Sequence, residues 1–342
     1  MAEVYTGFNN EEDVVTEVQQ TLSSGMFSGG VGTLSTFFTS SAQSSSNGKY
    51  FYDVYKTSPA TDSEAEVQFS IAFGHYDGSG SIGVLGSSYT DRPSAAVYSQ
   101  FRNLLLAPND DKFTFTPSKD RKHVYVISMA RARMREKMDP GNWELHLSGS
   151  AAKKISLIDD SGATTNPTVN QGGRVFNVVS GTIASGDAVT NTAAASETTD
   201  GAYGLFYPDM GIIVLNGQKL DQGYLALGTH TGSNAAKNNS QKLFAAVSRS
   251  ANFVARREEQ LSTTHYFCRV TNKKYNFSTN PTFFTQSDGS LTVSSMQNDP
   301  KVYVTTVGLY NDNNELLAVA KLSKPLLKSF SREAIIKVKL DF

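Results

Sequence analysis

The first sequence pattern that could bind a ligand is a glycine-rich loop. Residues 78–83 read GSGSIG and match the dinucleotide-binding pattern GxGxxG, in which glycines let the backbone approach a pyrophosphate at a helix N-terminus. Here VLGSSYTDRP separates Gly83 from the next expected helix, near Pro93, and no acid-terminated second strand follows about 20 residues later. We therefore interpret the loop as a connection between antiparallel strands and expect no cofactor.

The histidines and the cysteine do not form a metal-binding pattern. The chain has five histidines and one cysteine, and only His265 and Cys268 lie close together, in HYFC. Residues three apart on a strand point to opposite faces, so these two make a poor ligand pair. We interpret them as a strand histidine and a buried free thiol, and we expect no metal site.

Catalytic acids, bases and nucleophiles are also not arranged in a recognisable motif. No serine lies in a G-x-S-x-G elbow between a strand and a helix, and only the fold can decide whether a serine meets a histidine and an acid. The adjacent acids Asp159–Asp160 and Glu258–Glu259 are interpreted as solvated loop charges. We expect that the protein is not an enzyme and has no catalytic residue.

Basic side chains cluster at 131–137, RARMREK, and near the C-terminus. A nucleic-acid binder needs clustered Lys and Arg with stacking aromatic side chains, whereas this chain has a net charge of −1 and shows no such module. We expect no nucleic acid as a partner. Arg131, Arg133 and Arg135 are interpreted as a solvated face or as an ion-paired contact with an acidic partner protein.

Composition limits the class of protein. The chain has 342 residues, is 18% charged, and contains 20 Phe, 15 Tyr and 27 Gly, a composition that favours many short strands and tight turns. Its N-terminus is acidic where a signal peptide is basic, and its apolar runs, such as GIIVL, are far shorter than a membrane helix. We expect a soluble protein from a reducing compartment, with no membrane insertion.

Residues 1–48 are predicted to form an N-terminal helix followed by an extended Gly/Ser arm. Asn10 is a suitable N-cap, Val14, Val18 and Leu22 recur at i+4, and Gly25 ends the pattern. The arm mixes glycine and serine with three aromatic residues, Phe27, Phe37 and Phe38. Because such a segment lacks a local core, we expect these rings to contact a partner and the arm to be mobile in the free protein.

Residues 49–148 are predicted to be β-rich, with one helix. YFYDVYK, EVQFSIAF, KFTFT and HVYVIS are typical of strands. The helix follows Asp91, has Pro93 in its first turn and an apolar stripe of Val97, Phe101, Leu104 and Leu105, and stops at Pro108. Asp139-Pro140-Gly141-Asn142 predicts a turn between HVYVIS and the strand that contains Trp143.

Residues 149–202 are predicted to be a polar insertion or long loops, with disorder as the alternative. Residues 203–342 are predicted to be β-rich again, with a YGLFY/GIIVLNG hairpin and a short helix at NSQKLFAAVS. Two strands around Asn311–Asn314 form a second hairpin, and Ile336, Val338 and Leu340 lie on one face of a last strand. The predicted fold class is mainly β, with antiparallel, sandwich-like sheets and a few short α-helices.

Several stretches resemble a family of virion structural proteins from large contractile-tailed bacteriophages. Cyanophage-type myophages are prominent among these phages. The stretches are FSIAFGHYDGSGS, VYSQFRNLLL, MDPGNWELHLSG, YGLFYPDMGIIVLNG and the C-terminal YVTTVGLYNDNNELLAVAKLSKPLLKSFSREAIIKVKLDF. The resemblance extends over most of the chain, is most specific in the last two stretches and is weakest at 180–202. It implies a virion protein of the tail or baseplate without catalytic or cofactor residues.

The resemblance and the residue patterns together predict that the chain is a structural subunit of a contractile phage tail. We first expect a baseplate component that mediates protein–protein assembly. Its partners would be other tail or baseplate proteins and copies of itself, and it would be made in the host cytoplasm and located in the virion. The alternatives are a neck, collar or tail-fibre attachment protein, or a receptor- or glycan-binding module of the virion. For the last of these, Tyr203, Phe206 and Tyr207 would be the tools, although their alternation favours core packing.

Overall fold

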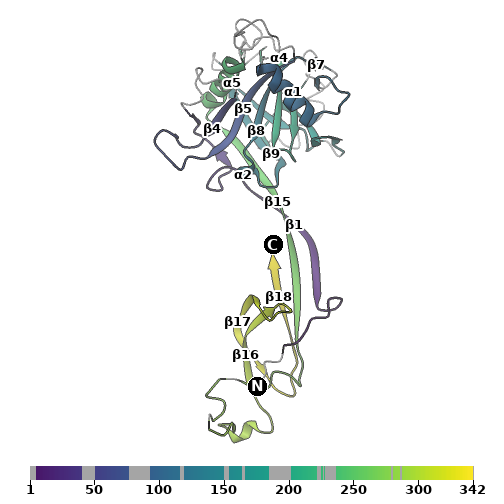
Figure 1. Cartoon of the computed structure of the whole chain (residues 1–342), viewed down its shortest axis with the longest axis vertical. Helices are drawn as coiled ribbons and strands as arrows, with labels where there is room; N and C mark the ends of the chain where they lie inside the picture. The colour runs from purple at the N-terminus through teal and green to yellow at the C-terminus, as the bar shows by residue number, and fades with distance from the viewer. Residues whose placement is uncertain are drawn as a thin grey trace. The chain divides into compact units, whose positions relative to one another are not determined.

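A computed structural model describes residues 5–40, 51–76, 93–115, 119–149, 154–163, 166–184, 202–221, 225, 227, 236–278, 280–285 and 287–341. In these residues the protein is mainly β with a few short helices, as predicted (Figure 1). The chain divides into two compact units, and each is described by itself. The larger unit is Leu22–Glu259, and the smaller unit combines Met1–Thr21 with Gln260–Phe342.

The larger unit is built on one antiparallel sheet with the strand order β15-β9-β10-β12-β13-β14-β8-β5-β4-β3. The strands of the larger unit, in the sheet and outside it, are β2 (Thr33–Leu34), β3 (Phe38–Thr39), β4 (Phe51–Tyr55), β5 (Val67–His75), β6 (Phe113–Phe115), β7 (Lys119–Arg121), β8 (His123–Met129), β9 (Lys137–Ser148), β10 (Lys154–Asp159), β11 (Thr168–Asn170), β12 (Gly173–Ser180), β13 (Gly204–Tyr207), β14 (Ile212–Asn216) and the first part of β15 (Phe253–Val270). Its helices are α1 (Pro93–Leu105), α2 (Arg131–Met134), α4 (Gly217–Asp221) and α5 (Ala236–Ser250).

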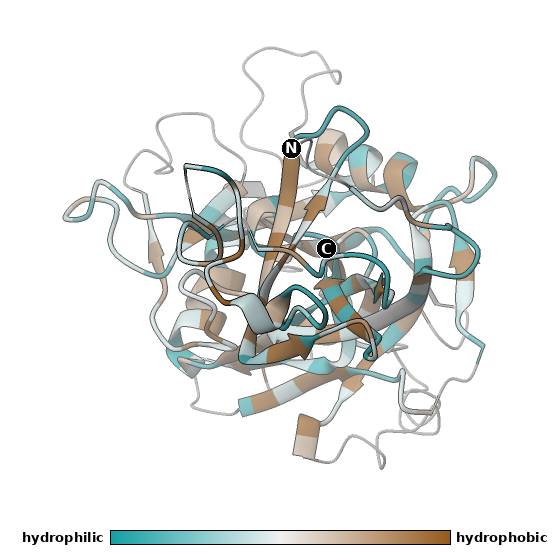
Figure 2. Ribbon diagram, turned by 90° about the horizontal axis from the view of Figure 1, so that it is seen from below, coloured by the Kyte–Doolittle hydropathy of each residue, from teal (hydrophilic) through white to brown (hydrophobic). Residues whose placement is uncertain are grey.

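Both faces of this sheet are buried at its central strands, β8 and β14. Successive residues of a strand point to opposite faces, and in β8 Val124 and Val126 belong to one core cluster whereas Tyr125 and Ile127 belong to the other. Helix α1 contributes to the first cluster and α5 to the second. The alternation of apolar and polar residues along the strands and helices is visible in Figure 2. Each fully buried large apolar side chain stabilises such a core by roughly 1.5–3 kcal/mol.

Residues 14–25, predicted as a helix, form strand β1 (Val14–Gly25) instead. The strand lies beside β15 in the sheet order, and Thr16 Oγ1 is 3.4 Å from Thr264 Oγ1 across the pair. The segment VVTEVQQT is rich in β-branched residues, which pack well on a pleated surface. Pairing with a long partner strand therefore outweighs the i+4 spacing on which the helix prediction depended.

The Gly/Ser arm has a local core, so the expectation that its aromatic rings lack one is wrong. Phe27 and Phe37 are buried in the core of the larger unit. Their ring centroids lie 5.5 Å from that of Phe253 and 6.4 Å from that of Phe69, respectively. Of the three predicted rings only Phe38 is exposed. The rest of the predicted arm, from residue 41, lies outside the described residues.

The predicted insertion at 149–202 contains sheet strands. Strands β10 and β12 lie between β9 and β13, and Leu157 and Val178 are fully buried in the core, so long loops were the wrong prediction for this part. The tract 185–201 lies outside the described residues, as does the GSGSIG loop. The predicted turn at 139–142 lies within β9, where the pairing with β15 shifts register and Gly141 has a positive φ of 78°.

Most other predicted elements are confirmed. Helix α1 starts at Pro93 and α5 covers NSQKLFAAVS, and β13 and β14 form the first hairpin. In the smaller unit β16 (Val302–Tyr310) and β17 (Leu316–Lys328) form the second hairpin, and β18 (Ala334–Asp341) is the last strand. β18 pairs with β15 from Thr263↔Asp341 to Val270↔Ala334.

The smaller unit differs from the larger one in its packing. All three hydrophobic core clusters of the described residues lie within the larger unit. The β16–β17 hairpin is a separate two-stranded sheet, and a single short 3-10 turn at Ser294–Met296 (η4) precedes it among the described residues. The smaller unit buries single apolar side chains such as Ile336 and Val338 but has no core cluster among its described residues, so it depends largely on strand pairing and polar contacts.

Candidate functional site

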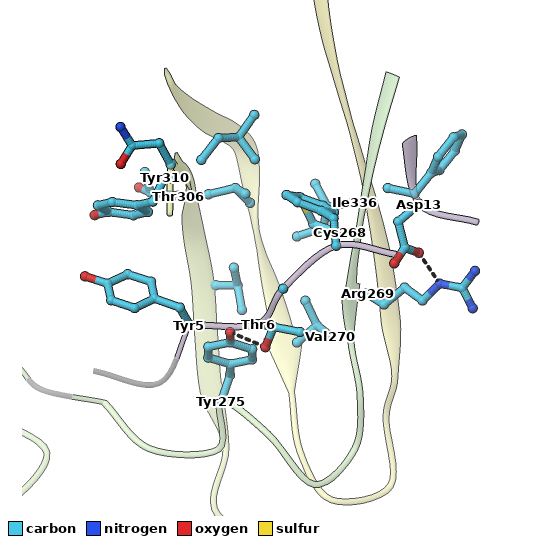
Figure 3. A pocket seen from close by; sticks show the side chains of 18 of the residues that line it. Tyr5, Thr6, Asp13, Cys268, Arg269, Val270, Tyr275, Thr306, Tyr310 and Ile336 are labelled. Atoms are coloured by element: carbon cyan, nitrogen blue, oxygen red, sulfur yellow. Dashed lines mark hydrogen bonds and ion pairs between the residues drawn. The ribbon is translucent and has the colours of Figure 1, made fainter. Parts of the chain in front are cut away.

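The smaller unit contains a pocket of about 680 Å³ (Figure 3). Its walls come from the N-terminal segment 5–13, the end of β15 with Tyr275 after it, strand β16 with the turn that follows, and Ile336 of β18. Tyrosine side chains, a cysteine, an ion pair and aliphatic residues line it, among them Tyr5, Cys268, Tyr275, Tyr310 and Ile336. The lining is therefore about as polar as it is apolar.

Hydrogen bonds and ring contacts hold the N-terminal segment against the C-terminal strands. Thr6 Oγ1 and Tyr275 Oη are 2.8 Å apart, and the rings of Tyr5 and Tyr310 lie with centroids 4.9 Å apart. Lys274 Nζ donates to Thr6 Oγ1 at 3.4 Å. Residues almost 270 positions apart in the sequence thus form one wall, which no local sequence pattern predicts.

An ion pair closes one end of the pocket, as Figure 3 shows. Arg269 Nε donates to Asp13 Oδ1 at 2.6 Å, and the backbone N–H of Asn9 donates to Asp13 Oδ2 at 3.0 Å. The Asn9 N–H and the Arg269 guanidinium hold the pKa of the Asp13 carboxyl below its ordinary value, against the opposite effect of burial. A carboxylate fixed on both oxygens is an anchor rather than a general base.

Cys268 lines the pocket but is not an activated nucleophile. Burial, and then the negative charge of Asp13, raise the pKa of its thiol, so it is protonated near neutral pH. The nearest histidine in sequence, His265, is buried and pairs with Glu17 at 3.1 Å. Among the described residues no group of three His, Cys, Asp or Glu side chains is placed to hold a metal ion.

A serine, a histidine and a glutamate do meet elsewhere, on β9 and β10. Ser156 Oγ is 3.1 Å from His146 Nδ1, and His146 Nε2 contacts Glu144 Oε1. The backbone N–H of Ile183 donates to the other Glu144 oxygen at 3.0 Å. His146 and Ser156 are cross-strand partners, so the cluster arises from strand register and no sequence motif could have found it.

This cluster lacks the other parts of a hydrolytic site. Ser156 lies in the middle of a paired strand rather than on a turn, so its neighbouring N–H groups belong to the sheet. The described residues around it therefore offer no pair of N–H donors for an oxyanion. We interpret the three side chains as a hydrogen-bonded chain that joins β9 to β10.

The adjacent acids interpreted as solvated loop charges are not solvated. Asp159 and Asp160 are buried: Asp159 accepts N–H groups of Gly141 at 2.8 Å and Ser161 at 2.9 Å, and Asp160 accepts the N–H of Asn177 at 2.8 Å. Burial raises the pKa of Asp159. The second pair is largely buried in ion pairs, Glu258 with Lys137 at 3.0 Å and Glu259 with Arg257 at 2.7 Å. Both pairs are structural.

The predicted partner-contact residues are not gathered at one place by any contact in the described residues. Phe27 and Phe37 are core residues and offer no surface to a partner. Arg133 pairs with Glu66 at 2.8 Å, and Arg135 pairs with Glu259 at 3.2 Å. Arg131, Arg135 and Phe38 are exposed, and their contact with a partner stays a prediction.

The aromatic residues considered for glycan binding lie in β13 or, for Tyr203, directly before it. Phe206 and Tyr207 are fully buried, and burial raises the pKa of Tyr207 to about 12. Tyr203 packs partly against the core, with the Lys219 ammonium 5.2 Å from its ring centroid. Core packing, the alternative reading of these residues, is the correct one for Phe206 and Tyr207.

Comparisons with family models, with curated proteins and with solved structures found no match. The phage-tail expectation therefore rests on the sequence motifs alone. No helix among the described residues is long and apolar enough to cross a membrane.

Proposed function

We propose that this chain is a structural subunit that acts through protein–protein assembly, as a baseplate component of a contractile phage tail. One observation carries the assembly role: the smaller unit exposes large apolar side chains and has no core cluster among its described residues. The side chains more than half exposed are Tyr303, Leu316, Leu317, Val319 and Ile335. Among the described residues of the larger unit, Val169 on a short strand is comparably exposed.

Physical chemistry favours a partner for such a surface. A two-stranded hairpin is marginally stable in water by itself, and contiguous exposed apolar side chains usually mark a protein contact. Burying them against neighbouring subunits would stabilise both the hairpin and the assembly. The pocket gives less support to catalysis, because its thiol is protonated and its carboxylate is held in an ion pair.

The placement in a phage tail is supported by the motifs of the sequence, and it has a direct test. Virions carrying an epitope-tagged copy would be imaged by cryo-electron microscopy after antibody labelling. We expect label at the baseplate. Label at the neck or on a fibre would contradict the baseplate assignment, and protein in the lysate but in no purified particle would contradict the virion role.

The lining of the pocket favours a second candidate, a glycan- or receptor-binding module. Tyr5, Tyr275 and Tyr310 line it, and tyrosine rings stack on the apolar faces of sugars while their hydroxyls hydrogen-bond. A glycan array probed with the whole chain tests this candidate. Tyr310→Ala would abolish a specific signal, whereas Tyr303→Ala, on the same strand but outside the pocket lining, would leave it unchanged.

A further inference from the structure

Strand β17 has an outer edge that can accept another strand. In the described residues it pairs with β16 alone, so the backbone groups on its other side are free to bond a further strand. Leu309 pairs with Ala318 and Tyr310 with Leu316, which makes Leu317 an extra residue, and both leucines are more than half exposed. An edge with these side chains is a site for strand addition.

The segment along this edge is complementary to the same segment of a second copy. The segment 315–321 reads Glu-Leu-Leu-Ala-Val-Ala-Lys, with an acid at one end, a base at the other and apolar residues between. If a second copy lies antiparallel across a two-fold axis at Ala318, Glu315 faces Lys321 of the other copy, and Leu317 faces Val319. All four of these side chains are exposed. A two-fold axis makes each contact twice.

The rest of β17 is protected against further pairing. Beyond Lys321 the register with β16 shifts, since Thr306 pairs with Lys321 and Val304 pairs with Leu326. The residues between include Lys324 and Pro325, and proline has no backbone N–H to donate. Charges and proline are features that stop strand edges from aggregating, whereas the bulge at Leu317 lies inside the segment that stays open to pairing. Pairing is thereby limited to 315–321 and closes as a dimer.

We propose that this chain forms a two-fold dimer in which residues 315–321, that is Glu315 and the start of β17, pair antiparallel with the same residues of a second copy, centred on Ala318. The charge complementarity and the two-fold symmetry of the segment favour a second copy over an unrelated protein. The inference rests on the assembly role proposed above but not on the phage tail. If the dimer is absent while the protein still enters virions, this inference alone fails.

Sedimentation velocity of the full chain at increasing concentration tests the dimer, with charge reversal as the specific probe. Glu315→Lys or Lys321→Glu places like charges opposite each other twice, and we expect each to weaken the dimer at least about tenfold. The double variant restores both pairs and should recover most of the affinity. Lys324→Glu, outside the paired segment, is the matched control and should leave the dimer unchanged. Rescue by the double variant would not occur if the single variants merely disturbed the hairpin.

Disulfide trapping reports the register independently. In a Cys268→Ser background, Ala318→Cys places two thiols directly opposite each other, within the Cα separation that a disulfide spans, so mild oxidation should give a covalent dimer. Ala320→Cys places its two thiols roughly 13 Å apart along the strands and should not cross-link. A monomer at every soluble concentration would overturn the proposal. So would a dimer that is insensitive to both charge reversals, or cross-linking at 320 but not at 318.

Discussion

Lys328 is a buried ammonium group in a unit that has no apolar core cluster among its described residues. Its Nζ donates to the Asn272 carbonyl at 3.1 Å, the Asn276 side-chain oxygen at 2.8 Å and the Ser329 carbonyl at 3.0 Å. Burial lowers the pKa of this ammonium. One charge with three acceptors thus ties β17 to the segment after β15, a polar contact in place of an apolar one.

Replacing Lys328 with methionine should destabilise the smaller unit by roughly 2–4 kcal/mol, because three oxygen atoms lose a charged donor while the aliphatic stem is kept. Lys324→Met, at an exposed position of the same strand, is the matched control and should change stability by less than about 0.5 kcal/mol. Hydrogen exchange of residues 272–276 measures the effect. Equal protection in the two variants would show that the three hydrogen bonds add nothing.

Phe27 and Phe38 lie in the same stretch of sequence but differ in burial, which allows a clean comparison. Phe27→Ala should cost about 3–5 kcal/mol of the free energy of unfolding of the larger unit, since the ring is 1% exposed and packs edge-on against Phe253. Phe38→Ala should cost less than about 1 kcal/mol, because that ring is 40% exposed. Urea unfolding measures both. Similar values would contradict the core role of the arm.

At the scale of elements, sequence periodicity predicted what is local. Helices α1 and α5 and the β16–β17 hairpin have caps, stripes or turn residues within a few positions, and each is present. β1 was missed because its apolar spacing also fits a strand, and only its long-range partner β15 decides between the two. The Ser156–His146–Glu144 contacts and the pocket depend on register between distant segments, which periodicity does not encode.

Deleting residues 334–342 should unfold the smaller unit and leave the larger unit folded. The deletion removes β18, which pairs with β15 over eight residues and buries Ile336 and Val338, worth roughly 1.5–3 kcal/mol each. The larger unit has its own core clusters and keeps them. Hydrogen exchange resolved along the chain should show loss of protection only in 5–21 and after residue 260. Loss in both units would contradict their independence.

A point substitution controls for the length of that deletion. Ile336→Ala removes a buried side chain and should destabilise the smaller unit by about 2–4 kcal/mol. Ile335→Ala is the matched control, because its side chain is 66% exposed and contributes little within one chain. A larger effect at 335 than at 336 in a dilute sample would contradict the pairing of β18 with β15.

As the pH is lowered, the smaller unit should unfold before the larger unit. The Asn9 N–H lowers the pKa of Asp13, His265 that of Glu17 and Thr263 that of Asp341, and hydroxyl and backbone donors lower that of Asp288 to about 2. A carboxyl with a depressed pKa binds its proton more readily in the unfolded chain. It therefore stabilises the fold above its ordinary pKa, near 4, and that contribution is lost as the pH falls toward 2.

Among the described aspartates of the larger unit, the pKa shifts do not all have the same direction. Burial raises the pKa of Asp159, whose contribution to stability grows as the pH falls, whereas hydrogen bonds from Arg174 outweigh burial and lower the pKa of Asp209. Hydrogen exchange along an acid titration should show the smaller unit losing protection at a higher pH than the larger one. Asp13→Asn should reduce that difference. Simultaneous loss in both units would contradict the assignment.

At the scale of the whole molecule, the chain separates a unit with core clusters from a unit that has none among its described residues. The larger unit is one contiguous segment, 22–259, whereas the smaller unit takes its residues from both ends of the chain. All core clusters of the described residues lie in the contiguous segment, where they cover both faces of the sheet at its central strands. A unit of this size buries enough surface to fold without the rest of the chain.

The fragment 22–259 should therefore fold by itself, with a single cooperative urea transition and a midpoint close to that of the larger unit in the whole chain. The part of β15 that the fragment keeps retains its pairing with β9 and β2, since Phe253 still faces Leu145 and Leu34. The reciprocal fragment, 1–21 joined to 260–342 by a flexible linker, should show no cooperative transition when dilute, because its few buried apolar side chains form no core cluster among the described residues and many others are exposed. Raising its concentration should increase its protection at 315–321 if pairing between copies stabilises the hairpin. A reciprocal fragment that unfolds cooperatively at every concentration, and does so with the stability of 22–259, would show that the smaller unit has a sufficient core of its own.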